Sequence, residues 1–166
     1  MKLNPALDQS ALAQAFAKDQ RLQIGDFLDQ PDALRLAAEF ENIDWRLVLN
    51  EGKQHFDIAP HQLEAMTPEQ MSALHRAALL RGETEFQYIY KNYPVSDVAE
   101  GSGLTSPVLE ETLKFMNSAD VLQFLNGVTG CSADYCDVQA TRYENGHFLT
   151  THDDNVDGKN RPFAYV

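Results

Sequence analysis

The chain has 166 residues, enough for one domain with a hydrophobic core, and 43% of them are hydrophobic. Charged residues make up 23%, close to the globular average, which excludes disordered and fibrous classes. Lys and Arg number 13 and Asp and Glu number 25, so the net charge is −12. Because an acidic surface repels phosphate backbones, we expect no direct binding to nucleic acid.

No apolar run approaches the ~18 residues that a membrane span needs, so we expect no membrane association. Residues 1–8 lack the basic start and apolar middle of a signal peptide, which favours a cytoplasmic location. The spacing of Cys131 and Cys136 fits neither a C-x-x-C redox motif nor a zinc knuckle. We expect both to be reduced thiols.

The first 130 residues or so are predicted to be mainly helical. Capping residues and apolar spacing predict helices that begin near Ser10, Pro31, Thr67, Ser106 and Ser118. Alternating patterns predict strands over residues 21–28, 45–50, 55–58 and 86–91. Residues 96–106 show no apolar period, so we expect a flexible loop there.

From residue 136 onward, strand patterns predominate. Asn145-Gly146 is a strong hairpin signal between alternating segments over residues 136–144 and 147–154. A further turn at 157–160 precedes a predicted strand over residues 162–166. We therefore predict a single α+β domain, with helical support over about residues 1–130 and a sheet core that begins over about 131–166.

A two-residue turn at Asn145-Gly146 would set the pairing of the hairpin. Tyr143 would then face Phe148, and both would share a sheet face with Thr150 and His152. That face would be largely polar, which suits either solvent or the lumen of a barrel with a polar ligand.

His152 and Asp154 are the candidate metal ligands. Residues i and i+2 of a strand project to the same side, so an imidazole and a carboxylate could reach one cation. This is part of the ligand set of a non-haem Fe(II) site, which needs one further His. The pair alone is a weak signal, because H-x-D arises readily by chance. Asp153 to Gly158 also matches the start of an EF-hand loop, but Ala164 occupies the position of the bidentate Glu.

The segment from Tyr143 to Asp154, followed by residues 158–161 and Tyr165-Val166, resembles the Fe(II)- and 2-oxoglutarate-dependent dioxygenases. It is most similar to their prolyl hydroxylase branch, which includes ribosomal-protein prolyl hydroxylases. The spacing of Tyr143 nine residues before His152 makes the match more specific than H-x-D alone.

The resemblance implies N-terminal helices packed on an incomplete double-stranded β-helix, or jelly roll. It implies that His152 and Asp154 bind iron and that Tyr143 binds 2-oxoglutarate, with Tyr165 as a weaker candidate for the same role. It also implies that the third metal ligand and the basic residue for the 2-oxoglutarate carboxylate lie beyond Val166. We therefore expect the sequence to be the N-terminal part of a longer, C-terminally truncated domain that is inactive alone.

The implied reaction is hydroxylation of a peptidyl proline, with succinate and CO2 as co-products and with ascorbate as a supporting reductant. The acidic chain would suit a basic protein substrate, such as a ribosomal or translation protein. Two alternatives remain open: hydroxylation of a small molecule, and a non-catalytic jelly-roll binding module.

Overall fold

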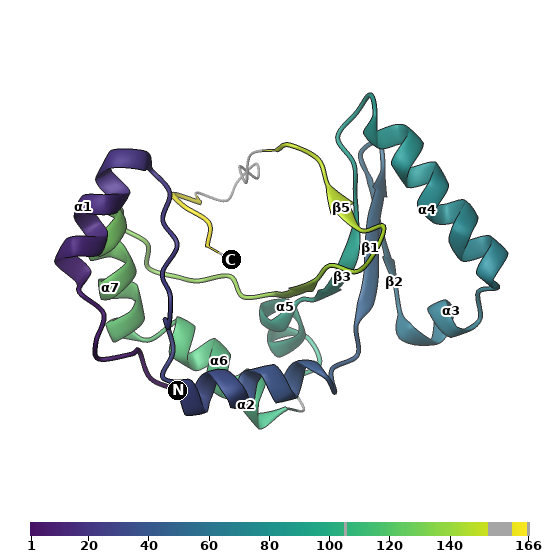
Figure 1. Cartoon of the computed structure of the whole chain (residues 1–166). Helices are drawn as coiled ribbons and strands as arrows, with labels where there is room; N and C mark the ends of the chain where they lie inside the picture. The colour runs from purple at the N-terminus through teal and green to yellow at the C-terminus, as the bar shows by residue number, and fades with distance from the viewer. Residues whose placement is uncertain (105, 153–160, 166) are drawn as a thin grey trace. The chain divides into compact units, whose positions relative to one another are not determined.

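The computed structural model describes residues 1–104, 106–152 and 161–165, and these form seven helices and one five-stranded antiparallel sheet (Figure 1). The chain divides into two compact units. Unit 1 comprises residues 1–42, 95–138 and 154–166, and unit 2 comprises residues 43–94 and 139–153. The α+β class predicted from the sequence is confirmed, whereas the jelly roll stays a prediction.

The described part of unit 1 is helical. Its helices are α1 (Gln9–Asp19), α2 (Gln30–Phe40), α5 (Val95–Glu100), α6 (Pro107–Met116) and α7 (Ala119–Thr129). The side chains of Asp8, Asp29, Ser106 and Ser118 each accept a hydrogen bond from a backbone N–H in the first turn of a helix. Asp8 therefore begins α1, and the expected cap Ser10 lies within the helix.

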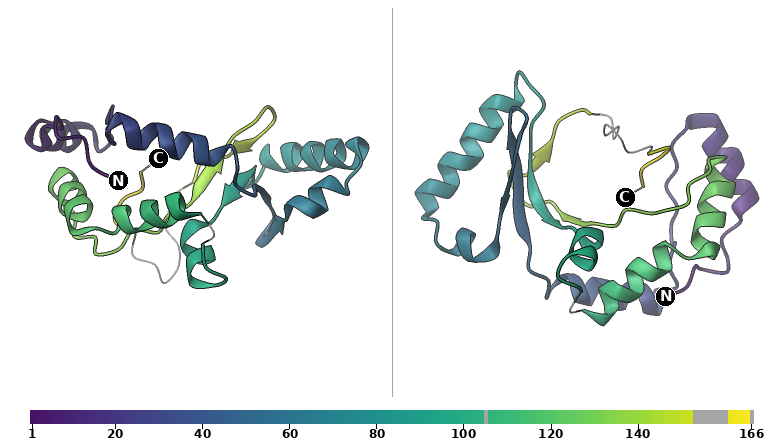
Figure 2. Two further views of the ribbon diagram at one scale, coloured as in Figure 1. Left: turned by 90° about the horizontal axis from the view of Figure 1, so that it is seen from below. Right: turned by 180° about the vertical axis from the view of Figure 1, so that it is seen from behind.

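The core of unit 1 lies between α1, α6, α7 and the segment that precedes α2. Helices α1 and α7 run side by side in Figures 1 and 2 and pack against each other. The buried apolar residues are Phe115, Met116, Val121, Phe124, Leu125 and Val128. The ring of Phe27 lies edge-on to Phe115 and Phe124, with centroids 6.4 and 6.1 Å away. Phe27 thus fixes its segment by burial rather than by strand pairing.

Three sequence predictions in unit 1 are wrong. Residues 21–28 form no strand, and only an isolated bridge joins Leu28 to Leu3. Residues 95–100 form helix α5 instead of a loop, because Val95 and Ser96 are buried and Ser96 exchanges two hydrogen bonds with Val138. Residues 162–165 are irregular rather than extended in a sheet.

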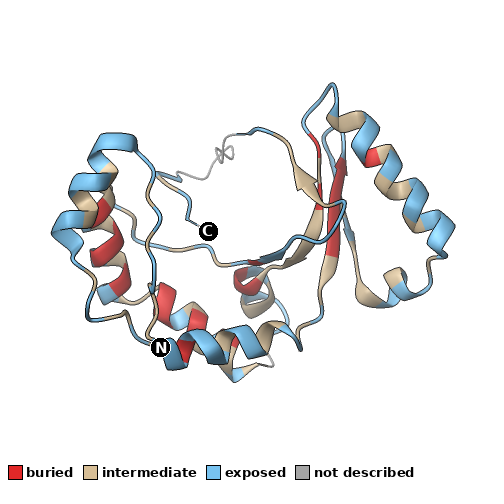
Figure 3. Cartoon of the chain, viewed as in Figure 1, coloured by how far each residue is buried: buried red, intermediate tan, exposed pale blue. Residues whose placement is uncertain are grey.

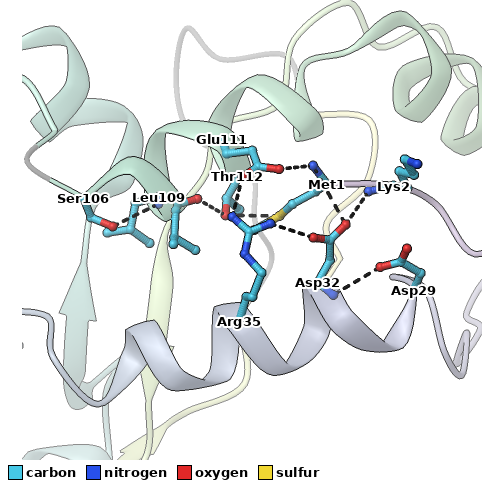
Figure 4. Close-up of polar contacts among 10 residues, drawn as sticks. Met1, Lys2, Asp29, Asp32, Arg35, Ser106, Leu109, Glu111 and Thr112 are labelled. Atoms are coloured by element: carbon cyan, nitrogen blue, oxygen red, sulfur yellow. Dashed lines mark hydrogen bonds and ion pairs between the residues drawn. The ribbon is translucent and has the colours of Figure 1, made fainter.

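A partly exposed charge cluster joins α2 to α6 (Figure 4). The ammonium group of Met1 contacts the carboxylate of Glu111 and lies 3.9 Å from Asp32. Arg35 bridges the same two carboxylates at 2.9 and 2.7 Å. Two cations and two carboxylates therefore alternate, but solvent screens their attraction because Arg35 and Glu111 are 48% and 36% exposed.

Unit 2 contains the sheet and two helices. Its elements are β1 (Arg46–Glu51), β2 (Gln54–Ile58), α3 (Pro60–Glu64), α4 (Pro68–Gly82), β3 (Tyr88–Tyr93), β4 (Ala140–Arg142) and β5 (Phe148–Leu149). The predicted capping box begins α4: Thr67 accepts from the backbone of Gln70, and the Gln70 side chain accepts from the backbone of Thr67. The strands predicted over residues 45–50 and 55–58 are confirmed as β1 and β2, which pair antiparallel with Leu49 opposite Phe56.

One face of the sheet packs on α4 and forms the second core. Leu47, Leu49 and Ile89 are buried there with Ala78 of α4, and Phe148 packs against them. Within unit 2, Figure 3 shows a long buried stretch along β1. Because side chains alternate along a strand, Tyr88 and Tyr90 project from the opposite face.

The predicted hairpin of residues 136–144 with 147–154 is wrong. Both β4 and β5 pair with β3: Arg142 lies opposite Lys91, and Phe148 lies opposite Ile89. The β-turn is present, since His147 N donates to Glu144 O at 2.9 Å. It does not join two strands that pair with each other; it separates β4 from β5, which pair with successive parts of β3. Of the two central residues of the turn, Asn145 and Gly146, only Gly146 has a positive φ, 86°. A type I′ hairpin turn requires a positive φ at both.

Candidate functional site

A row of aromatic rings crosses unit 2 and connects two of the residues singled out from the sequence. We call Tyr143, Tyr90, Tyr88, Phe86 and His152 the aromatic row. Successive ring centroids along it are 5.2, 5.7, 5.7 and 6.0 Å apart. Tyr143 and His152 are therefore linked through β3, although Phe148, the predicted partner of Tyr143, packs in the core on the other face.

Tyr143 stands at one end of the aromatic row, directly after β4. Its ring stacks on Tyr90 with an angle of 20° between the planes. Desolvation raises the pKa of the Tyr143 hydroxyl, so the group is protonated and able to donate a hydrogen bond at neutral pH. Glu144, the next residue, forms ion pairs with Lys91 at 2.8 Å and Arg142 at 3.2 Å, which hold the turn on the sheet.

His152 stands at the other end of the row. Its Nδ1 lies 3.0 Å from the carbonyl oxygen of Thr150. Because a carbonyl oxygen only accepts, Nδ1 carries the proton of the neutral ring and Nε2 carries the lone pair. Metal-binding histidines commonly have this arrangement, in which one nitrogen donates to a carbonyl group and the other faces the metal.

A buried polar network beside His152 was not predicted from the sequence. Gln87 and Asn50 are 0% and 3% exposed. Gln87 lies between the aromatic residues Phe86 and Tyr88, on the side that faces the core. A polar residue at a core-facing position of an alternating strand was the available signal.

The predicted metal pair is only partly covered by the described residues. Asp154, and the EF-hand-like positions Asp153, Asn155, Asp157 and Gly158, lie outside them. Within the described ranges, no group of three or more His, Cys, Asp or Glu side chains could hold a metal ion. Of the predicted pair, only His152 lies within the described ranges.

Tyr165 belongs to unit 1 and has surroundings of its own. Its hydroxyl lies 3.6 Å from Cys136 Sγ, and its ring centroid is 6.5 Å from that of Phe27. Burial raises the pKa of both the tyrosine hydroxyl and the Cys136 thiol. Cys131 and Cys136 are both free thiols.

Comparison with known proteins gave no match to any family model, curated protein or solved structure. Among the described residues, no helix combines the length and apolar character that crossing a membrane demands.

Proposed function

We propose that the protein is an Fe(II)- and 2-oxoglutarate-dependent dioxygenase that hydroxylates a prolyl residue of a protein substrate. The aromatic row carries this proposal, because it links Tyr143 and His152, the two best-described residues of the motif that resembles the family. The jelly-roll fold is part of the proposal, with β3, β4 and β5 as strands of its core.

Each residue has a distinct role in the proposed site. His152 binds the metal through Nε2 while Nδ1 donates to Thr150, and Asp154 supplies a carboxylate oxygen. Tyr143 donates its hydroxyl proton to a carboxylate oxygen of 2-oxoglutarate, and Tyr165 is a second candidate for that cosubstrate. Iron with 2-oxoglutarate and O2, kept reduced by ascorbate, supplies the oxidising power for C–H hydroxylation.

The net charge of −12 supports a basic protein as the substrate. Opposite charge steers encounter and discriminates against acidic partners, whereas an aromatic face accommodates the apolar pyrrolidine ring. A ribosomal or translation protein has the required basic character, and a cytoplasmic location would give access to it.

The test is production of succinate from 2-oxoglutarate by the natural full-length protein, with mass spectrometry of a basic protein substrate. We expect one added oxygen on a proline, and loss of turnover in His152→Ala. The control His61→Ala, at an exposed histidine of α3, retains turnover. Equal turnover in His152→Ala and the natural protein would overturn the metal assignment, and added oxygen on a small molecule alone would overturn the substrate class.

A further inference from the structure

We propose that Gln87 and Thr150 are positioning residues that set the tautomer and orientation of His152. This inference rests on the proposed function, because it concerns the histidine assigned there to the metal. It assigns roles to Gln87, which lies outside the segment that resembles the family, and to Thr150, which lies within it. Three successive sets of hydrogen bonds connect the buried core of unit 2 to the imidazole.

The first step anchors the Gln87 side chain. Its Nε2 donates to the carbonyl oxygens of Asn50 at 2.7 Å and Tyr88 at 3.1 Å. Its Oε1 accepts from Arg81 Nε at 3.1 Å. Both polar atoms of a fully buried amide are thus partnered, so the side chain has one favoured orientation.

The second step fixes Thr150 on the backbone of Gln87. Gln87 N donates to Thr150 Oγ1 at 3.0 Å, and Thr150 N donates to Gln87 O at 3.0 Å. This reciprocal pair continues the contact of β5 with β3 just past the last ladder pair, Tyr88 with Leu149. The backbone of Thr150 is therefore held through both its amide N–H and its side-chain hydroxyl.

The third step is the hydrogen bond between the Thr150 carbonyl group and His152. The carbonyl oxygen of Thr150 accepts from Nδ1 of the imidazole at 3.0 Å. A histidine in water favours the proton on Nε2, the opposite tautomer, so the carbonyl group must hold the proton at Nδ1. The partner of a ligating imidazole commonly changes metal affinity ~10-fold to 100-fold when it is lost.

The test determines which ring nitrogen of His152 carries the proton in the metal-free protein. It uses ¹⁵N–¹H correlation spectra of the imidazole, at a pH where the ring is neutral. We expect the Nδ1–H tautomer in the natural protein. Thr150→Val removes the acceptor for Gln87 N and shifts the population toward Nε2–H, whereas Thr150→Ser keeps the hydroxyl and the natural tautomer. The control Thr151→Val, at the exposed neighbouring threonine, changes neither.

A second measurement uses Mn(II) as the probe with the natural full-length protein. We expect Thr150→Val to bind Mn(II) ~10-fold more weakly than Thr150→Ser. An Nε2–H tautomer in the natural protein would overturn the inference without any variant, even if Thr150→Val fails to fold. An unchanged tautomer in folded Thr150→Val would also overturn it. Absence of 2-oxoglutarate turnover with the Nδ1–H tautomer intact would instead overturn the proposed function alone.

Discussion

Tyr143 and Tyr90 stack with their ring centroids 5.2 Å apart, and this contact joins a turn to the centre of the sheet. Tyr90 lies on β3, which pairs with β1 along one edge and with β4 and β5 along the other. The stack thereby fixes the residue proposed to bind 2-oxoglutarate against the strand with the most partners in the sheet.

The first prediction separates the ring of Tyr143 from its hydroxyl. Tyr143→Ala should lower the free energy of unfolding by about 1 kcal/mol, because it removes the stack on Tyr90. Tyr143→Phe should keep that stability but raise the KM for 2-oxoglutarate ~10-fold, because a hydrogen bond to a charged group is lost. Tyr135→Phe, at another exposed tyrosine, serves as the control. An unchanged KM in Tyr143→Phe would contradict the cosubstrate role.

The second prediction concerns the close approach of α4 to β5. A Cβ atom at Gly82 would lie 2.9 Å from Cε2 of Phe148, whose ring packs in the core. Gly82→Ala should therefore destabilise unit 2 by about 1 kcal/mol, despite the better helix propensity of alanine. Gly25→Ala, where no atom lies within 4 Å, should be neutral. Urea unfolding measures both, and equal midpoints would refute the packing constraint.

The third prediction follows from the charge cluster in unit 1. Hydrogen bonds from Arg35 and the ammonium group of Met1 lower the pKa of Glu111 from 4.5 to about 2. A lowered carboxyl pKa contributes stability that is present above pH 4.5 and is lost as the pH falls toward 2.

Glu111→Gln should therefore flatten the stability profile over that acidic range. Glu110→Gln, which removes only the exposed pair with Lys114, is the matched control. Thermal melts at a series of pH values measure the effect. If Glu111→Gln and Glu110→Gln both show the same dependence of stability on pH as the natural protein, the Glu111 ion pairs contribute no pH-dependent stability.

The fourth prediction concerns His147 in the turn between β4 and β5. Desolvation lowers its pKa below 6.5, and the charges of His75 and Lys91 act in the same direction, whereas a hydrogen bond with the Arg142 backbone and the charge of Glu144 oppose them. The Nδ1 of His147 also accepts from Glu144 N at 3.1 Å, a bond that protonation of Nδ1 would remove. Because the folded state binds this proton more weakly than the unfolded state, stability should fall as the pH drops below 6.5.

His147→Gln should reduce this dependence, and His61→Gln on α3 should leave it unchanged. Hydrogen exchange of the β5 amides across the pH series reports the local effect, since the turn joins β5 to β4. Exchange protection that stays constant below pH 6.5 in the natural protein would contradict the prediction.

Local signals predicted the helices well because their caps act within a few residues. Thr67 with Gln70, Ser106 and Ser118 mark true helix starts. Strand partners were harder, since they depend on contacts distant in the sequence. The Asn145-Gly146 turn was predicted correctly. No local pattern indicated that the segments on either side of it, β4 and β5, would both pair with β3.

The candidate site was also predicted unevenly. The sequence named Tyr143 and His152, and the aromatic row links them through residues 86–90. It did not reveal that Gln87 is buried, because burial of an amide depends on partners such as Asn50 that come from another strand.

The shared edge of β3 has a consequence for how the sequence can change. In a hairpin, an inserted residue in the turn shifts the alignment of both flanking strands. Here β4 and β5 are each aligned by β3, through the pairs of Lys91 with Arg142 and Ile89 with Phe148. Residues 144–147, which follow Tyr143, can therefore lengthen or shorten while both strands keep their alignment, so we expect insertions and deletions to be tolerated between Tyr143 and β5.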